Sequence, residues 1–290
     1  MKQRTLALVL VLCGLLATSV PVIAADEELS ATQPEFVFDP STIVPGQPRV
    51  VVNDQVLNTD VPTRMIGNVT YVPYFPVIKA LYPDAVSTWT GERTIIEATG
   101  LNMEIIPAQK YVIINGRYLY QPNGFTTVDD RILFPVRTLC SWLGAEVSWD
   151  EINYCVVITA GGDPITSGAD YYDSTDLYWL SHIINAESGN QPLEGKIAVG
   201  NVVLNRVASS TFPNTVKEVI YQKNQFTPVR NGSINLEPNA ESVIAAKLCL
   251  DGANTVGNAL FFLNPRTASS SWASRNRPYI TTIGAHAFYG

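Results

Sequence analysis

An internal repeat of about 60 residues in the first half of the chain constrains the fold more than any other feature of the sequence. Residues 50–98 and residues 111–158 share one order of features: an apolar stretch, a two-residue turn, a second apolar stretch ending in proline, a short amphipathic segment and a closing apolar stretch. The turns are Asn53-Asp54 and Asn115-Gly116, and such pairs between apolar stretches are typical of tight β-hairpins. We therefore predict that each unit consists of a strand, a hairpin, a strand, a short helix and a strand.

The repeat resembles the copper amine oxidase N-terminal-like domain, or stalk domain, of secreted proteins from spore-forming Gram-positive bacteria. The resemblance covers residues 47–160 and rests on the hairpin turns, on the steps Tyr71-Val72-Pro73 and Phe134-Pro135-Val136-Arg137, and on the segment Leu143–Asp150. Both histidines of the chain lie outside this region, and imidazole is a usual ligand of copper. We therefore expect the stalk domain to bind no metal or cofactor and to carry no catalysis.

The first 25 residues have the pattern of a signal peptide. Lys2 and Arg4 precede an apolar stretch at residues 6–17, and small residues follow near the expected cleavage position. The apolar stretch is short for a membrane helix, which needs about 20 residues. We therefore expect a secreted protein with a signal peptide at residues 1–25, a linker at residues 26–46 and no membrane association after cleavage.

Three cysteines remain after the signal peptide: Cys140, Cys155 and Cys249. Cys140 and Cys155 stand where the first unit of the repeat has the apolar residues Ile78 and Ile95. Two interpretations are open for this pair: two buried thiols, or a disulfide, which a secreted protein permits. Cys249 lies in an apolar helical segment, and we expect it to be a core residue.

Residues 161–172 contain three glycines and a proline with little periodicity, so we interpret them as a linker before a second domain at residues 173–290. Hydrophobic periodicity and capping residues predict four helices in that domain, over residues 173–187, 193–207, 214–221 and 239–251. The expected capping residues are Asp173 or Ser174, Asn214 and Asn239. The second helix is apolar on most faces, as in a central buried helix. The chain after Ala259 is expected to be β-rich. The predicted fold class is α+β.

Composition and motifs exclude several classes of function. Hydrophobic residues make up 46% of the chain and charged residues 16%, which is typical of a globular protein. The formal net charge of −7 argues against a nucleic-acid partner. The sequence has no Gly-x-Ser-x-Gly, His-Glu-x-x-His or Cys-x-x-Cys motif and no phosphate-binding glycine loop. With only two histidines, a zinc or Ser-His-Asp site is hard to assemble. Carboxylates therefore remain as the candidate catalytic groups.

Glu187 differs from the other carboxylates of the second domain. It lies at the C-terminal end of a predicted helix, where the helix dipole disfavours negative charge. It also follows an apolar stripe and borders a bend that contains Gly189 and Pro192. A half-buried carboxyl in this place would have a raised pKa, which a general acid requires. The alternative is an ordinary surface glutamate. Glu194 opens the next helix and can cap it, although its closeness to Glu187 leaves a second role open.

The segment Ile184–Val207, with the sequence INAESGNQPLEGKIAVGNVVLNRV, resembles the signature of SleB-type spore cortex-lytic and cell wall hydrolases. The likeness continues to the end of the chain and spans residues 173–290. The resemblance implies a lysozyme-like, mainly helical domain that degrades peptidoglycan, with the catalytic glutamate at Glu187. The family more often has a basic residue and a second acid soon after that glutamate, where this chain has Gly189-Asn190-Gln191.

The resemblance also implies contacts to the substrate. Amide side chains hydrogen-bond sugar hydroxyl groups, and aromatic rings stack on sugar rings. The residues expected to bind substrate are Gln225, Phe226, Glu194, Asn264, Trp272 and Tyr289. For His286 a packed or surface imidazole is the simpler interpretation.

We therefore expect a secreted glycosidase that cleaves muramic acid–glucosamine bonds of spore cortex or cell wall in a Gram-positive bacterium. Because no second carboxylate is compelling, a lytic transglycosylase is favoured over a hydrolytic muramidase or glucosaminidase assisted by Glu194 or water. A non-catalytic wall-binding scaffold is the alternative from another class. The expected partners are peptidoglycan glycan strands and, through the stalk domain, a wall or spore-coat protein.

Overall fold

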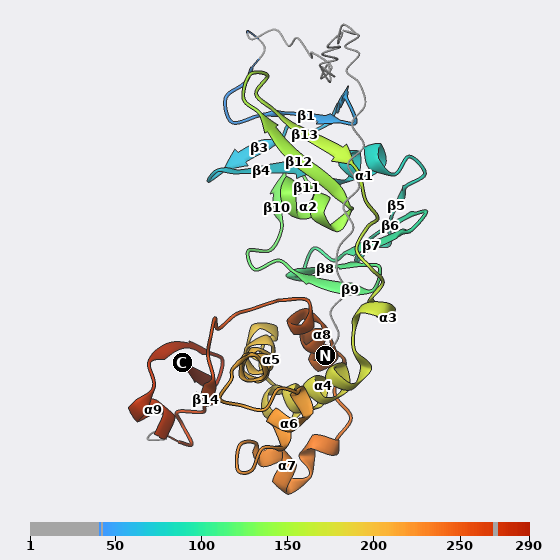
Figure 1. Cartoon of the computed structure of the whole chain (residues 1–290). Helices are drawn as coiled ribbons and strands as arrows, with labels where there is room; N and C mark the ends of the chain where they lie inside the picture. The colour runs from blue at the N-terminus through green and yellow to red at the C-terminus, as the bar shows by residue number, and fades with distance from the viewer. Residues whose placement is uncertain (1–40, 42, 269–271) are drawn as a thin grey trace, which may run out of the picture. The chain divides into compact units, whose positions relative to one another are not determined.

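The computed structural model describes residues 41, 43–268 and 272–290 (Figure 1). The expected signal peptide at residues 1–25 lies outside the described residues. No helix in the described part of the chain is long and apolar enough to span a membrane. The fold is mixed α+β, with a β-rich N-terminal region followed by a mainly helical C-terminal region.

In residues 43–160, the structure has thirteen strands and two short helices. The strands are β1 (Arg49–Val52), β2 (Gln55–Val56), β3 (Arg64–Ile66), β4 (Val69–Pro73), β5 (Val86–Trp89), β6 (Thr94–Ala98), β7 (Leu101–Ile105), β8 (Tyr111–Ile114), β9 (Arg117–Tyr120), β10 (Thr126–Val128), β11 (Arg131–Pro135), β12 (Ala145–Asp150) and β13 (Cys155–Ala160). The helices are α1 (Tyr74–Leu81) and α2 (Val136–Trp142). Each helix follows a strand that ends in proline.

Each of the three sheets in this region combines strands from both halves of the repeat. Their strand orders are β12-β13-β1-β2, β10-β11-β4-β3 and β5-β6-β7-β8-β9. Strand β1 pairs in parallel with β13, with Val51 opposite Val157. The two predicted hairpin turns are confirmed: Asn53-Asp54 and Asn115-Gly116 join antiparallel strands, and all four residues have positive φ. Residues of both halves therefore share one hydrophobic core.

The three cysteines of the described part are free and buried, so the disulfide interpretation is wrong. Burial raises the pKa of the Cys140 thiol to about 12 and that of Cys155 to about 11. Oxidation requires the thiolate, and a thiol with so high a pKa supplies little of it at neutral pH. Cys140 belongs to the hydrophobic core with Ile78, Leu139 and Phe134, and thus behaves as a small apolar residue.

The C-terminal region contains mainly helices and ends in a small sheet. The helices are α3 (Gly168–Tyr171), α4 (Ser174–Ser188), α5 (Leu193–Ala208), α6 (Val216–Tyr221), α7 (Thr227–Asn231), the 3-10 helix η2 (Ser233–Asn235), α8 (Ala240–Leu250) and α9 (Trp272–Asn276). The strands are β14 (Phe261–Leu263), β15 (Tyr279–Ile283) and β16 (His286–Tyr289), in the order β14-β16-β15.

Side-chain caps fix where these helices begin. Asp173 accepts hydrogen bonds from the amides of Thr175 and Asp176 at 2.8 and 2.9 Å, so α4 begins where the sequence predicts. Asn239 caps α8 in the same way, because its side chain accepts a hydrogen bond from the amide of Ser242. This predicted cap is therefore also confirmed. The predicted cap Asn214 is wrong by one residue, because Thr215 accepts the bond from the amide of Glu218. The short helices α3, α7 and α9 were not predicted.

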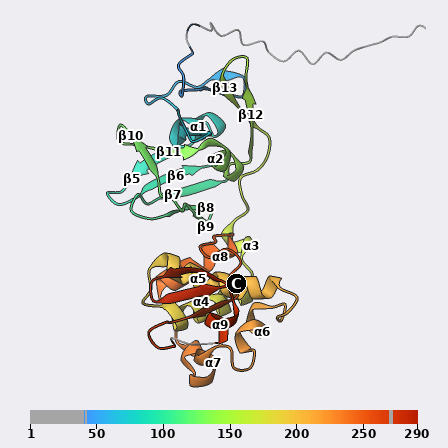
Figure 2. The ribbon, with the colours of Figure 1, turned by 90° about the vertical axis from the view of Figure 1, so that its left-hand side faces the viewer.

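Helix α5 is central in the C-terminal region, as its apolar sequence predicts. It packs against α4 and α8, and α4 lies beside it in Figure 2. The close approach of α5 and α8 depends on Gly200, because a Cβ atom there would lie 2.6 Å from Cys249 Sγ and 2.9 Å from Ile184 Cδ1. The buried core around these helices includes Ile183 and Val199.

Residues of the hairpin β8–β9 also belong to the hydrophobic cluster of α8. Tyr111 is buried in that cluster, and Tyr118 packs against it. The carboxylate of Asp251, just after α8, pairs with the guanidinium of Arg117 in β9 and accepts hydrogen bonds from the amide of Tyr118 and the hydroxyl of Tyr172. The side chain of Asp251 is fully buried. The Asp251 carboxylate therefore links strand β9 to the C-terminal end of helix α8.

Candidate active site

Glu187 lies in the last turn of α4, as the sequence predicts. Its side chain is half-buried, and burial raises the pKa of the carboxyl to about 7 from an ordinary value of about 4.3. Burial is the cause of this shift. Within residues 41, 43–268 and 272–290, no hydrogen bond or ion pair occupies the carboxyl group. It can therefore hold a proton at neutral pH and donate it to a ligand.

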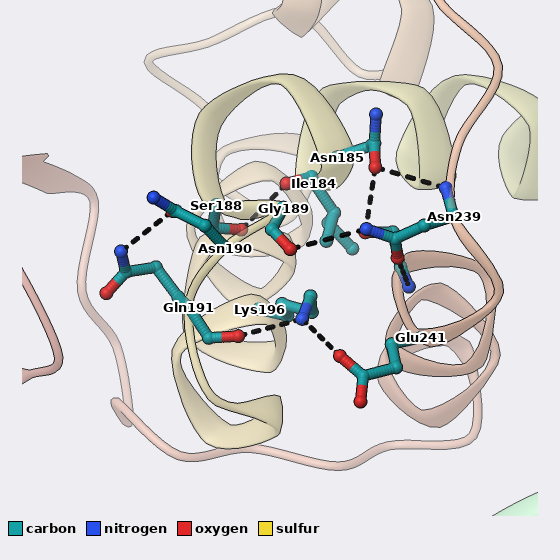
Figure 3. Close-up of polar contacts among 10 residues, drawn as sticks. Ile184, Asn185, Ser188, Gly189, Asn190, Gln191, Lys196, Asn239 and Glu241 are labelled. Atoms are coloured by element: carbon teal, nitrogen blue, oxygen red, sulfur yellow. Dashed lines mark hydrogen bonds and ion pairs between the residues drawn. The ribbon is translucent and has the colours of Figure 1, made fainter.

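The last turn of α4 is fixed by hydrogen bonds to the beginning of α8 (Figure 3). Asn185 Oδ1 accepts from the amide of Asn239 at 3.1 Å and from the hydroxyl of Ser242 at 3.3 Å. Asn239 Nδ2 donates to the carbonyl oxygen of Gly189 at 3.3 Å. Asn185 and Gly189, on either side of Glu187, are thus held by hydrogen bonds, which fix the backbone that carries Glu187.

The side chain of Lys196 holds the bend between α4 and α5. Its side chain is only 2% exposed, and Nζ donates to the carbonyl oxygen of Gln191 at 2.7 Å and to Glu241 Oε2 at 2.6 Å (Figure 3). Sequence reasoning missed this residue. The available signal was a single lysine beside the apolar run Ile197–Val199 in a helix predicted to be buried. A buried ammonium group needs such partners.

Gln191 joins the bend to the small sheet. Its Oε1 accepts from the amide of Ala285 at 2.8 Å, in the turn between β15 and β16. Gly284, in the same turn, has φ +57°, and a Cβ atom there would lie 2.3 Å from Gln191 Oε1. The neutral amide of Gln191 thus positions the turn.

Glu194 does not cap α5, contrary to one expectation. The N-cap residue of α5 is Pro192, and it provides no side-chain cap. Glu194 Oε1 instead accepts from Lys110 Nζ at 2.8 Å. The hydrogen bond from Lys110 keeps the pKa of the Glu194 carboxyl below its usual range, in spite of partial burial. Glu194 is therefore ionised at neutral pH, whereas much of Glu187 is protonated.

The remaining predicted site residues differ in exposure. Gln225 is exposed, and the Trp272 side chain lies edge-on to Phe261 at 5.6 Å and is 54% exposed. Asn264 Oδ1 accepts from the amide of Arg266 at 3.0 Å, so this oxygen is engaged in a turn.

Phe226 and Tyr289 are buried rings of the core. Phe226 is 6% exposed, lies 6.4 Å from Phe262 and has the guanidinium of Arg206 at 5.2 Å. Tyr289 is 9% exposed and pairs with Phe261 across the sheet. Phe261 is thus the ring neighbour of Trp272 and the strand partner of Tyr289. His286 is buried beside Phe262, as a packed imidazole.

The sequence profile of the cell wall hydrolase family matches residues 190–289 of the chain. A solved structure, the catalytic domain of the germination-specific lytic transglycosylase SleB from Bacillus anthracis, is 39% identical over 43% of this chain and 100% of that one, with a TM-score of 0.39. The C-terminal domain belongs to the cell wall hydrolase family. Glu187 lies just before the range that the profile of the family matches.

Two curated relatives of the cell wall hydrolase domain are both named spore cortex-lytic enzyme. The one from Oceanobacillus iheyensis is 39% identical over 128 residues, and the one from Bacillus cereus is 41% identical over 117 residues. These matches cover 44% and 40% of this chain, and 46% and 45% of the relatives. The chain therefore spans less than half the length of the curated relatives that it matches.

The profile of the copper amine oxidase N-terminal domain matches residues 51–158 and again residues 113–171. This region contains no histidine. Among residues 41, 43–268 and 272–290, no group of three His, Cys, Asp or Glu side chains could hold a metal ion. The donor set of the region therefore does not fit a copper centre.

Proposed function

We propose that the cell wall hydrolase domain cleaves the glycan strands of peptidoglycan at muramic acid–glucosamine bonds, as a lytic transglycosylase with Glu187 as its catalytic acid and base. The observation that carries this proposal is the half-buried Glu187 carboxyl with a pKa of about 7 and no competing partner among the described residues. A group with a pKa near neutrality gives and takes a proton with similar ease. The names of the relatives support the choice of substrate.

In the proposed reaction, the protonated Glu187 carboxyl donates its proton to the glycosidic oxygen as the bond from that oxygen to C1 of muramic acid breaks. The resulting carboxylate then accepts the proton of the 6-hydroxyl group of the same sugar. The freed O6 attacks C1 and closes a 1,6-anhydro ring. Proton and bonds balance without water, and Glu187 ends in its starting state.

The surroundings of Glu187 favour this route over hydrolysis by two carboxylates. A retaining or inverting glycosidase needs a second carboxylate as nucleophile or base. Among the described residues, no hydrogen bond joins a second carboxyl group to Glu187, and burial accounts for its raised pKa. Glu194, the candidate in the sequence, is bound by Lys110. These contacts fit a mechanism in which Glu187 alone acts first as the acid and then as the base.

The chemical form of the products tests the proposal. Digestion of purified peptidoglycan by the full chain should release fragments with 1,6-anhydromuramic ends. Mass spectrometry would find them about 18 mass units lighter than hydrolytic products, because no water is added. Reducing muramic ends would place the reaction among muramidases. Reducing glucosamine ends would place it among glucosaminidases.

The activity should also depend on pH through Glu187. Its acid form starts the reaction, so kcat/KM should be nearly constant below pH 7 and decrease about tenfold per pH unit well above the pKa. An ordinary glutamate would give the same decrease near pH 4. Initial rates of turbidity loss in a peptidoglycan suspension between pH 5 and pH 9 measure the profile. A profile that is flat from pH 6 to pH 9 would exclude this carboxyl as the acid.

We further propose a secreted protein whose N-terminal region, residues 47–160, consists of two copies of one unit. The repeated order of strands and helix supports this, as do the two overlapping profile matches. The catalytic domain would comprise residues 173–290, with a lysozyme-like core. Gln225, Asn264 and Trp272 would contact the sugars, whereas Phe226 and Tyr289 would act by supporting the rings and turns around them.

A further inference from the structure

A hollow of about 800 Å³ opens on the N-terminal region. Its lining residues lie between positions 60 and 132, so none of them belongs to the cell wall hydrolase domain. Its floor is the junction of β4 and α1, where Tyr74 and Phe75 lie. One wall is the edge strand β5, and the other is the turn between β10 and β11. The volume lies in the range of small-molecule binding sites.

Three aromatic rings form much of the lining. Trp89 is 57% exposed on β5, and Ser87, two residues earlier on the same face of the strand, also lines the hollow. The ring of Tyr74 is fixed edge-on against Phe134 at 5.8 Å. A large exposed indole beside fixed rings is a typical platform for the apolar face of a ligand.

The polar groups of the hollow are mixed and nearly balanced in charge. Arg131 Nε donates to Asp60 Oδ2 at 2.9 Å, and both side chains are more than half exposed. Asp130 adds a second carboxylate beside them. This set offers donors and acceptors to neighbouring hydroxyl groups, and its one arginine, already paired with Asp60, offers little attraction to an anionic polymer. The lining therefore suits a neutral, hydroxyl-rich ligand.

A second, smaller hollow of about 340 Å³ occupies the corresponding place in the other half of the repeat. Pro135 and Trp149 line it, where the first hollow has Pro73 and Trp89. In the second hollow the ring of Trp149 packs edge-on against that of Tyr154 at 5.1 Å.

The aromatic floor is missing from the second hollow. Val136 and Arg137 stand in the places of Tyr74 and Phe75. The common architecture thus carries two further aromatic side chains beside its tryptophan in the first half alone. The second half builds the same strands and helix without these two rings, so the aromatic lining of the first hollow exceeds what the common architecture requires.

We propose that the hollow around Trp89 binds a glycan strand of N-acetylated amino sugars, as a second site outside the catalytic domain. The choice of peptidoglycan among such glycans rests on the proposed function. A peptide is the weaker candidate, because three prolines line the hollow and have no backbone N–H to donate to a peptide carbonyl. The site would hold the polymer while Glu187 acts on it.

The test measures binding separately from cleavage. The full chain with Glu187→Gln is mixed with insoluble peptidoglycan, and separately with a soluble tetramer of β-1,4-linked N-acetylglucosamine. Adding Trp89→Ala should weaken both interactions about five- to tenfold, the loss expected for one ring contact. Two controls should bind within a factor of two of the parent: Trp149→Ala, in the second hollow, and Val86→Ala, 59% exposed on the opposite face of β5.

The outcomes separate this proposal from the catalytic one. Equal binding with and without Trp89, or an equal loss with Trp149→Ala, would overturn the glycan site even if the wild-type chain cleaves peptidoglycan. Binding that depends on Trp89 would support it even if the wild-type chain cleaves nothing. A proline-rich peptide that binds in a Trp89-dependent way, without any sugar binding, would assign the hollow to peptides and also overturn the proposal. A near-native unfolding transition of Trp89→Ala shows that folding is intact.

Discussion

The Glu187→Gln variant should fold like the parent chain and lose peptidoglycan cleavage by a factor of about 10²–10⁴, the usual contribution of general acid catalysis. Glutamine keeps the shape of the side chain but has no proton to transfer. Because the other candidate carboxylate, Glu194, is already bound by Lys110, the loss should lie toward the upper end of this range. Release of soluble fragments, measured at pH 6 with both proteins at equal concentration, gives the ratio of rates.

Unfolding of the same variant provides an independent check. Burial raises the pKa of Glu187 in the folded chain, so folding favours the protonated form. Below about pH 4 both states of the wild type are protonated and the substitution should change stability little. Above pH 7 the wild type must fold with a buried charge, and the variant should be the more stable protein. A variant that is inactive because it is misfolded would be less stable at every pH.

Glu194→Gln is the matched control for activity. It makes the same chemical change seven residues along, in a carboxylate that Lys110 already binds. The ion pair is partly exposed, so its loss should change the free energy of unfolding by at most about 1 kcal/mol. Cleavage should decrease far less than with Glu187→Gln. Full lytic activity of Glu187→Gln, or equal losses in both variants, would overturn the assignment of the catalytic acid.

Local rules predicted the framework of the site correctly. Asp173 and Asn239 begin their helices through hydrogen bonds within three residues, and the hairpin turns depend on two adjacent residues each. The half-burial of Glu187 followed from its place after an apolar stripe. Each of these features is encoded by neighbours in the sequence, so single-sequence reasoning could reach it.

Contacts between distant segments were beyond that reasoning. The partner of Glu194 is Lys110, 84 positions away, and the partner of Lys196 is Glu241, 45 positions away. Aromatic composition likewise did not distinguish a buried ring, as in Phe226, from an exposed one, as in Trp272. Burial of a ring depends on which surface covers it, and that is set by the tertiary fold.

Asp251 contacts residues that are more than 130 positions away in the sequence. Its carboxylate is fully buried, and it accepts from Arg117 Nε at 2.8 Å and from the amide of Tyr118 at 3.3 Å. The hydroxyl of Tyr172 donates to it as well. Burial, followed by this hydrogen bond, raises the pKa of the Tyr172 hydroxyl. The site therefore satisfies one buried anion with a guanidinium, an amide and a hydroxyl.

The Asp251→Ala variant should lower the free energy of unfolding by about 3–5 kcal/mol, because it leaves the guanidinium of Arg117 buried without a counter-charge. Arg117 cannot turn to solvent easily, since its side chain is 15% exposed and its guanidinium lies 3.4 Å above the ring of Tyr171. Urea unfolding of the full chain, followed by circular dichroism, measures the loss.

Asp60→Ala is the control, because it also removes one carboxylate from one arginine. Both side chains of that pair are more than half exposed, so the loss should stay below about 1 kcal/mol. Equal, small losses in the two variants would show that the hairpin β8–β9 and α8 do not depend on each other through Asp251. A large loss confined to Asp251→Ala would mean that the N-terminal region stabilises the catalytic domain through a buried ion pair. Removing that region would then weaken α8, whose beginning is hydrogen-bonded to the last turn of α4 that carries Glu187.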